Sequence, residues 1–86
     1  MELSSLEARI LRFILSQSDE KCELRQLRAE FLPMSPHLIE FHLSGLVLTG
    51  LVEADGKSVQ ATEGGRRLRG QIPEEGPILH TLTVRV

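Results

Sequence analysis

The first half of the chain places apolar residues at helical spacing in three separate segments. In the first segment one helical face carries Leu6, Ile10, Phe13 and Ile14. Ser4 stands three residues before Glu7, which is the spacing of a capping box, where each side chain satisfies the backbone N–H of the other residue. The pattern therefore predicts a helix that begins after Ser4, followed by a polar loop over residues 17–21.

A second, shorter helix is predicted over residues 24–31. Its inward side carries Leu24, Leu27 and Phe31, and its outer side carries Arg25 and Arg28. Pro33 prevents the helix from continuing, because proline lacks the backbone N–H and its ring clashes with the preceding turn. A turn is therefore expected before the next helix.

Ser35 and Pro36 form a strong start signal for a third helix. The serine hydroxyl accepts a hydrogen bond from a free amide, and proline at the first helical position loses no needed donor. The helix is expected to run to about Thr49, where Gly50 can adopt the left-handed conformation that ends many helices.

After Gly50 the apolar period changes from helical to two-fold. Residues 51–54 and 57–62 flank Asp55-Gly56, one of the strongest hairpin turn signals in a short sequence. Residues 62–68 then return to helix or turn. A hairpin with its tip at Asp55-Gly56 is therefore predicted.

The end of the chain has a different character. Residues 70–77 form an acidic linker rich in proline and glycine, and residues 80–86 alternate in polarity like a strand, with Leu82, Val84 and Val86 on one side. We therefore divide the chain into residues 1–70 and residues 71–86, a linker with a C-terminal strand.

The order of helix, short helix, turn, helix and hairpin resembles a winged helix-turn-helix domain. The Ser-Pro start and the run from Leu46 through Gly50-Leu51-Val52 are similar to the end of the recognition helix in MarR- and ArsR-like repressors. Residues 61–68 are similar to the exit from their wing. The resemblance covers residues 4–70 and implies an α+β fold of three helices and a β-hairpin wing, here with a C-terminal strand-like extension. It also implies a DNA-binding regulator.

The third helix departs from the family pattern on its outer face. In the family this face reads base edges in the major groove, and the polar candidates for that role here are Ser35, His37, Glu40 and Ser44. No Lys or Arg lies between Arg28 and Lys57. Instead, the outer face centres on Phe41 and Leu48, with Leu38 beside them.

These apolar residues allow two interpretations. Exposed apolar stripes are normally covered, so the C-terminal segment or a second subunit is expected to bury Phe41 and Leu48. Alternatively, the helix binds another protein through this face. The predicted protein interface comprises Leu38, Phe41, Leu48, Leu82, Val84 and Val86.

The evidence for DNA binding therefore depends on basic residues that flank the third helix. Phosphate contacts are expected from Lys57, Arg66, Arg67, Arg69, Arg25 and Arg28. For any single arginine, a solvated charged surface is the simpler explanation. The net charge of −2 also argues against binding driven only by electrostatics.

Composition narrows the remaining possibilities. The only cysteine is Cys22, which cannot form an internal disulfide, and no signal peptide or membrane span is evident, so a cytoplasmic location is expected. His37 and His42 are five positions apart on a helix and do not converge as metal ligands would, so no metal is expected. No nucleophile and base stand together, so we expect neither a cofactor nor enzyme activity.

Two functions thus remain open from the sequence. The first is a DNA-binding regulator that contacts DNA mainly through the wing. The second is a protein-interaction module that uses the apolar side of the third helix. A homodimer is expected in either case, because a C-terminal strand needs a sheet to join and residues 78–86 can reach a second subunit.

Overall fold

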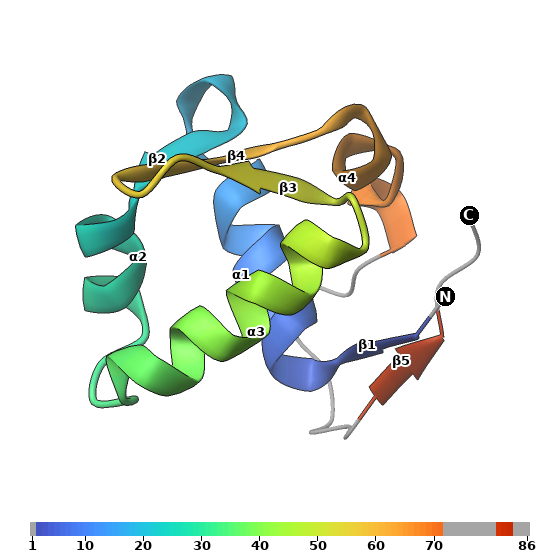
Figure 1. Ribbon diagram of the computed structural model, residues 1–86. Coiled ribbons are helices and arrows are strands. Elements are labelled where there is room, and N and C mark those ends of the chain that lie inside the picture. The colour runs from blue at the N-terminus through green and yellow to red at the C-terminus, as the bar shows by residue number, and fades with distance from the viewer. Residues whose placement is uncertain (1, 72–80, 84–86) are drawn as a thin grey trace.

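The computed structural model describes residues 2–71 and 81–83 (Figure 1). Its helices are α1 (Ser5–Leu15), α2 (Leu24–Glu30), α3 (Pro36–Leu48) and α4 (Glu63–Arg67), with short 3₁₀ turns at Ser18–Glu20 and Arg69–Gln71. Its strands are β1 (Glu2–Ser4), β2 (Lys21–Glu23), β3 (Val52–Ala54), β4 (Ser58–Ala61) and β5 (Thr81–Thr83). The protein therefore has an α+β fold.

Two antiparallel sheets organise the strands. The larger sheet has the order β2-β4-β3, with Cys22 opposite Val59 and Ala54 also opposite Val59. The smaller sheet pairs β1 with β5, with Leu3 opposite Leu82. In Figure 1 the larger sheet lies above α1 and α3, whereas the smaller sheet lies near the chain ends.

The hydrophobic core surrounds α1. Ile10, Leu11 and Ile14 have no exposed side-chain surface and lie between α3, α2 and the larger sheet. The neighbouring elements contribute Leu27, Ile39, Leu46, Val52, Val59 and Leu68. These residues are all aliphatic, as expected for a chain with three Phe, no Tyr and no Trp.

Local signals in the sequence predicted several helix and turn boundaries correctly. Ser4 caps α1, where its hydroxyl accepts from the Glu7 backbone N–H at 3.0 Å and its own N–H donates to Glu7 Oε1. The hydroxyl of Ser35 accepts from the backbone N–H of His37. Gly50 ends α3 with a φ of 79°. The physical reason is that each signal acts within a few residues.

The hairpin predicted at Asp55-Gly56 is confirmed. Gly56 has a φ of 95°, and the Asp55 carboxylate accepts the backbone N–H groups of Lys57 and Ser58 at 3.0 and 2.8 Å. These two hydrogen bonds lower the pKa of the Asp55 carboxyl group from its usual value. The turn therefore satisfies its own donors and needs no support from elsewhere.

The prediction of a loop over residues 17–21 is wrong at its end. Lys21–Glu23 forms β2, and Cys22 is buried in the sheet, where burial raises the pKa of its thiol. A three-residue strand with two charged positions shows too little periodicity to be recognised. It exists because β4 provides backbone partners on that side.

The C-terminal strand also has a different partner from the one expected. β5 pairs with β1 of the same chain, so the expectation that it needs α3 or a second subunit is wrong. No pattern of residues predicted β1, because Glu2–Ser4 is short and precedes the first helix. Val84, Val86 and the side chain of Leu82 lie outside the described part of the structure.

Candidate protein-binding face

The third helix is attached to the core by one side only. Ile39, Leu43 and Leu46 are buried against α1 and the sheet. At the flank of α3, His42 Nδ1 lies 3.3 Å from Ser4 Oγ and 3.4 Å from Glu7 Oε2, which links α3 to the start of α1. The opposite side of α3 is left at the surface.

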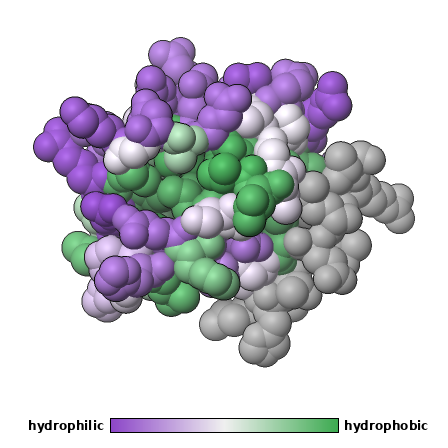
Figure 2. Space-filling model, in the orientation of Figure 1, coloured by the Kyte–Doolittle hydropathy of each residue, from purple (hydrophilic) through white to green (hydrophobic). Residues whose placement is uncertain are grey.

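That outer side is apolar and exposed. Phe41 is 71% exposed and Leu48 is 88% exposed, with Leu38 at 43% and Val47 at 40%. In Figure 2 apolar side chains occupy the middle of this face, over α3 and the hairpin beside it, and hydrophilic side chains surround much of it. The expectation that the C-terminal segment covers Phe41 and Leu48 is therefore wrong for the single chain, because that segment pairs with β1.

Most of the polar groups predicted to read DNA from α3 are engaged within the chain. The Ser35 hydroxyl caps the helix, and the Ser44 hydroxyl donates to the Glu40 carbonyl at 2.9 Å. The Glu40 carboxylate forms an ion pair with Arg28 of α2. Of the four predicted residues only His37 has an exposed side chain that makes no hydrogen bond with a described residue. Little base-reading chemistry is therefore available on this helix.

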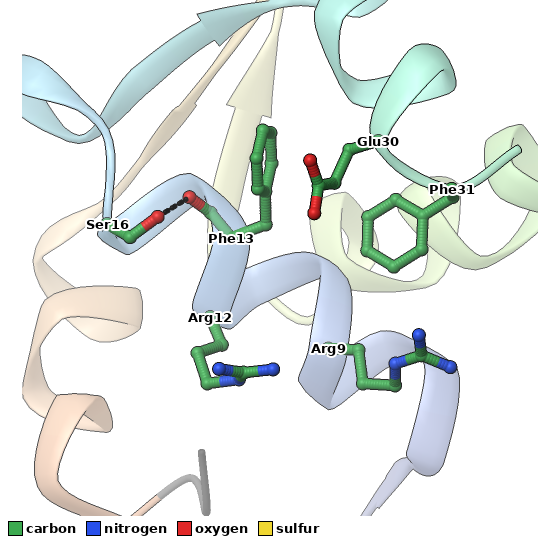
Figure 3. A pocket seen from close by; sticks show the side chains of 6 residues that line it. All are labelled: Arg9, Arg12, Phe13, Ser16, Glu30 and Phe31. Carbon is green, nitrogen blue, oxygen red and sulfur yellow. Dashed lines mark hydrogen bonds between the residues drawn. The ribbon is translucent and has the colours of Figure 1, made fainter. Parts of the chain in front are cut away.

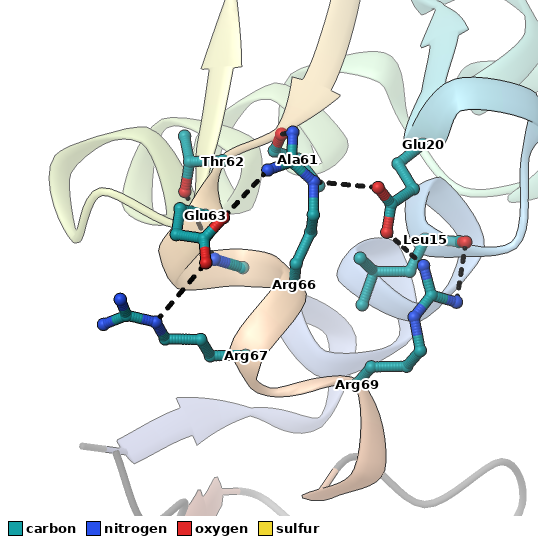
Figure 4. Close-up of polar contacts among 9 residues, drawn as sticks. Leu15, Glu20, Ala61, Thr62, Glu63, Arg66, Arg67 and Arg69 are labelled. Carbon is teal, nitrogen blue, oxygen red and sulfur yellow. Dashed lines mark hydrogen bonds and ion pairs between the residues drawn. The ribbon is translucent and has the colours of Figure 1, made fainter.

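The arginines that follow the hairpin are bound to acidic residues (Figure 4). Arg66 Nε donates to Glu20 Oε1 at 2.8 Å, and Arg69 forms an ion pair with the other oxygen of the same carboxylate. Arg69 also donates to the Leu15 carbonyl at 3.0 Å. We call Glu20, Arg66 and Arg69 the arginine clasp.

The clasp shifts the titration of Glu20. Partial desolvation raises the pKa of the Glu20 carboxyl group, but the hydrogen bonds and charges of Arg69 and Arg66 outweigh it, so the pKa lies below its usual value. Glu20 and its neighbour Asp19 have positive φ angles of 54° and 57°, which are unfavourable for residues with a side chain. The two guanidinium groups therefore help to hold a strained turn in place.

The predicted basic set does not form one surface. Among the described residues Arg67 forms an ion pair with Glu63, at 3.7 Å, and it lies with the clasp at the end of the sheet where β4 leads into α4. Lys57 precedes β4 at the hairpin tip, which Figure 1 places at the other end of that strand, beside α2. Lys57 is thus separated from Arg66, Arg67 and Arg69 by the length of β4.

Lys57 instead lies near the two arginines of α2. The Lys57 carbonyl accepts the Leu24 backbone N–H at 2.8 Å, and a surface hollow of about 370 Å³ is lined by Glu23, Leu24, Arg25, Arg28, Gly56 and Lys57. Within this group Arg25 pairs with Glu23 at 2.9 Å. We call Arg25, Arg28 and Lys57 the α2–hairpin cluster. Arg28 in turn pairs with Glu40, so both arginines of this cluster have acidic partners, as those of the clasp do.

A further hollow of about 320 Å³ lies between α1 and the end of α2 (Figure 3). Arg9 and Arg12 line it together with the rings of Phe13 and Phe31, and Arg9 lies 5.6 Å from the centre of the Phe31 ring. The Glu30 carboxylate projects between the two rings in Figure 3, which reduces the attraction of the hollow for an anion. The hollow is therefore not suited to a simple anion.

The candidate metal ligands do not come together in the structure. Cys22 is buried in β2, and His42 lies against Glu7 and Ser4 on the other side of α1. Within residues 2–71 and 81–83, no three His, Cys, Asp or Glu side chains are placed to share a metal ion. In the same ranges no helix combines the length and apolar character that a membrane span requires.

Sequence reasoning missed two exposed apolar residues. Val47 is 40% exposed at the edge of the outer side of α3, and Leu32 is 69% exposed after the end of α2. Val47 was missed because helical spacing places it between the buried face and the outer face, so its exposure depends on how closely α2 and the hairpin approach. Leu32 lies in the turn before α3, where periodicity does not predict direction.

Comparison with known proteins gives no match at three levels: no protein-family model, no curated protein and no solved structure matches this chain.

Proposed function

We propose that this chain is a winged-helix protein-interaction module that binds another protein through the outer face of α3, without a catalytic step. The observation that carries the proposal is the exposure of Phe41 and Leu48, at 71% and 88%. Side chains of this kind stabilise a complex by about 1.5–3 kcal/mol each when fully buried. We call Leu38, Phe41, Val47 and Leu48 the α3 face.

The order of the elements supports the winged-helix part of the proposal. From α1 onward the chain runs α1, β2, α2, α3, β3 and β4, with the three strands in one antiparallel sheet and a hairpin as the last two. In such an arrangement the helix before the hairpin presents its outer side to a ligand. In DNA-binding members that ligand is the major groove.

The side chains of α3 favour a protein over DNA as that ligand. Apolar surface at the centre with polar groups at the rim is the composition of a protein interface, whereas DNA surfaces need positive charge. Glu40 is the only charged residue within α3, and Arg28 neutralises it. A phosphate backbone would therefore gain little from this face.

A photo-activated cross-linking residue placed at position 48 tests the proposal. In cells the probe should form an adduct with a protein, and Phe41→Glu in the same chain should abolish that adduct. Arg67→Glu is a matched control, because Arg67 is exposed but belongs to α4 and not to α3. Absence of any protein adduct, together with salt-sensitive DNA binding by the purified chain, would overturn the proposal.

DNA binding remains a second candidate because of the α2–hairpin cluster. Arg25 has a side chain that is 82% exposed, and Lys57 lies beside it at the hairpin tip. If the chain binds DNA, changing both residues to Gln should weaken binding to all sequences and make the salt dependence less steep by about one unit per lost contact. The double change Arg66→Gln with Arg69→Gln should have a smaller effect, because both guanidinium groups share the Glu20 carboxylate, which is 22% exposed, whereas the Arg25–Glu23 pair is 82% and 54% exposed. Fluorescence anisotropy with duplex DNA over a salt series measures both.

A further inference from the structure

The hollow between α1 and the end of α2 gathers charges that the described part of the chain leaves unpaired. Arg9 and Arg12 line this hollow and form no ion pair with a described residue. The Glu30 carboxylate, which reaches the hollow from α2, likewise has no ion pair or hydrogen bond within residues 2–71 and 81–83. The other arginines of residues 2–71 all pair with acidic side chains: Arg25, Arg28, Arg66, Arg67 and Arg69.

Packing sets the positions of these charges. The Arg9 guanidinium lies 5.6 Å from the centre of the Phe31 ring, and that ring packs edge-to-face against Phe13 with 6.2 Å between the ring centres. Arg12 Nε is buried and has no hydrogen-bond partner among the described residues, so the stem of this side chain is enclosed. Figure 3 shows both arginines extending from α1, whereas the Glu30 carboxylate projects from α2. The hollow thus presents both signs of charge from two different helices.

A second hollow adjoins the first beside the turn that precedes α3. It has a volume of about 350 Å³ and shares Arg9, Glu30 and Phe31 with the first hollow. The rest of its lining is apolar and consists of Leu32, Pro33 and Met34. The charged hollow is therefore continuous with an apolar one.

The two hollows together indicate the chemistry of a ligand. A simple anion would be attracted by Arg9 and Arg12 but repelled by Glu30, and a simple cation would meet the reverse. A zwitterion gains from both signs, because guanidinium groups donate to a carboxylate and a carboxylate accepts from an ammonium group. The apolar hollow beside these charges has room for a hydrophobic side chain. The volumes of about 320 and 350 Å³ lie at the lower end of the range for small-molecule sites.

We propose that this site binds a free α-amino acid with a large apolar side chain, such as leucine. The ligand carboxylate pairs with Arg9 and Arg12, and the ligand ammonium group pairs with Glu30. The ligand side chain packs against Phe31 and Leu32. The bound amino acid therefore joins α1 to the end of α2 and to the turn before α3. None of these residues belongs to the α3 face, so the site does not depend on the proposed protein partner.

A nuclear magnetic resonance titration of the isotope-labelled chain with leucine tests the proposal. The backbone amide signals of residues 9–16 and 30–34 should shift, with a dissociation constant on the order of 1 mM for a ligand of this size. Isocaproic acid lacks the ammonium group and isoamylamine lacks the carboxylate, so each should bind at least about tenfold more weakly than leucine. Glycine, which has no side chain, should also bind more weakly.

Charge variants test which residues bind each end of the ligand. Arg12→Gln and Glu30→Gln should each weaken leucine binding by about tenfold. Glu30→Gln should at the same time strengthen the binding of isocaproic acid, because it removes the repulsion of the anion, and a merely structural role would not predict this opposite change. Arg67→Gln, at an exposed position on α4, is the matched control and should bind leucine unchanged. Circular dichroism should show that all three variants are folded.

Three results would overturn the proposal. The first is a chain whose amide signals do not shift at leucine concentrations about tenfold above the expected dissociation constant. The second is equal binding of leucine and isocaproic acid, or of leucine and isoamylamine. The third is a folded Glu30→Gln chain that binds leucine as well as the unchanged chain does. Each result leaves the proposed function intact, because the cross-linking experiment at position 48 concerns a different surface.

Discussion

Residues of the α3 face and of the arginine clasp were both predicted from the sequence to bind a partner. In the folded chain the charges of the clasp are paired, whereas the apolar side chains of the α3 face are exposed. The clasp residues are charged, and their groups are satisfied within the chain, because Arg66 and Arg69 share the two oxygens of Glu20. On the α3 face, Phe41 and Leu48 have no comparable cover. A group that is already satisfied gains little from a ligand, whereas exposed apolar surface gains on burial. The comparison teaches that residue type alone does not identify a binding surface.

The clasp also has a structural task that the α3 face lacks. It joins the strained turn at Asp19 and Glu20 to the segment that follows the hairpin, and Arg69 also holds the last carbonyl of α1. Changes at the clasp should therefore alter stability, whereas changes on the α3 face should alter association. The following experiments test this difference, beginning with the largest expected effect.

Phe41→Ser should weaken binding to the protein partner of the α3 face about a hundredfold, which corresponds to about 2.7 kcal/mol. The ring is 71% exposed in the single chain, so its burial by a partner stabilises a complex in a way that serine cannot reproduce. Stability of the single chain should change by less than about 0.5 kcal/mol, because the ring is mostly exposed. Cross-linking from position 48 measures partner binding, and thermal unfolding of the purified chain measures its stability. Leu32→Ser, also an exposed apolar position but outside α3, is the control and should leave association unchanged.

Gly65→Ala should destabilise the fold by roughly 1–3 kcal/mol, the usual range for overpacking a buried site. Gly65 is buried in α4, where an added Cβ would lie 2.2 Å from the Leu51 carbonyl oxygen. Gly64→Ala is the comparison on the same helix and should cost less, because its Cβ would lie 3.3 Å from the Gly50 carbonyl oxygen, a tight contact that a small shift relieves. Urea unfolding compares the two. Equal stability of both variants would contradict the close packing of α4 against Leu51.

Glu20→Gln should reduce stability in a manner that depends on pH. The pKa of the Glu20 carboxyl group is lowered in the folded chain from its usual value of 4.5. The carboxylate therefore contributes stability above about that pH and loses it as the pH falls through the lower folded value. The difference in unfolding free energy between the two chains should be largest near neutral pH and shrink below pH 4.5. A difference that does not vary with pH would contradict the clasp.

The same substitution separates the clasp from a DNA-binding surface. Removing the carboxylate charge releases Arg66 and Arg69. If pairing with Glu20 is what keeps these two arginines from DNA, the non-specific DNA affinity of Glu20→Gln should rise. The rise should disappear at high salt, because released counterions dominate such binding. No change at low salt would mean that the two arginines face away from any DNA surface.

Arg67→Ala should have the smallest effect. Its side chain is 70% exposed and its only ion pair with a described residue is the 3.7 Å contact with Glu63. Exposed pairs of this kind contribute about 0–1 kcal/mol, so the free energy of unfolding should stay within about 0.5 kcal/mol of the unchanged chain. Oligomeric state should be the same as well. A large loss of stability would show that Arg67 has a role that its contacts do not indicate.

Much of the fold was predictable because its signals are local. The capping box at Ser4, the start at Ser35-Pro36, the end at Gly50 and the turn at Asp55-Gly56 each involve residues at most three positions apart. The pairing of β5 with β1 was not predictable in the same manner. It joins Leu3 to Leu82 across nearly the whole chain, and no three-residue strand specifies a distant partner by itself.

The candidate site was likewise predictable only where its residues are close together in the sequence. Helical spacing placed Phe41 and Leu48 on one side of α3 from the sequence alone. Spacing did not indicate whether that side would be covered. Coverage depends on where the C-terminal segment goes, and the structure places β5 beside β1.

The sequence by itself therefore determined which residues share a helix face, where most elements begin and end, and where the chain reverses at the hairpin. Only the tertiary structure decided which charges are already neutralised, because Arg66 and Arg69 are 46 and 49 positions from Glu20. It also decided that Arg28 engages Glu40 and that Lys57 lies beside α2 instead of beside the clasp. Dihedral preferences and hydrogen bonds within a few residues determine the helix faces, the element boundaries and the hairpin turn. Contacts in the second group form only when the whole core brings distant segments together, so no local pattern can specify them.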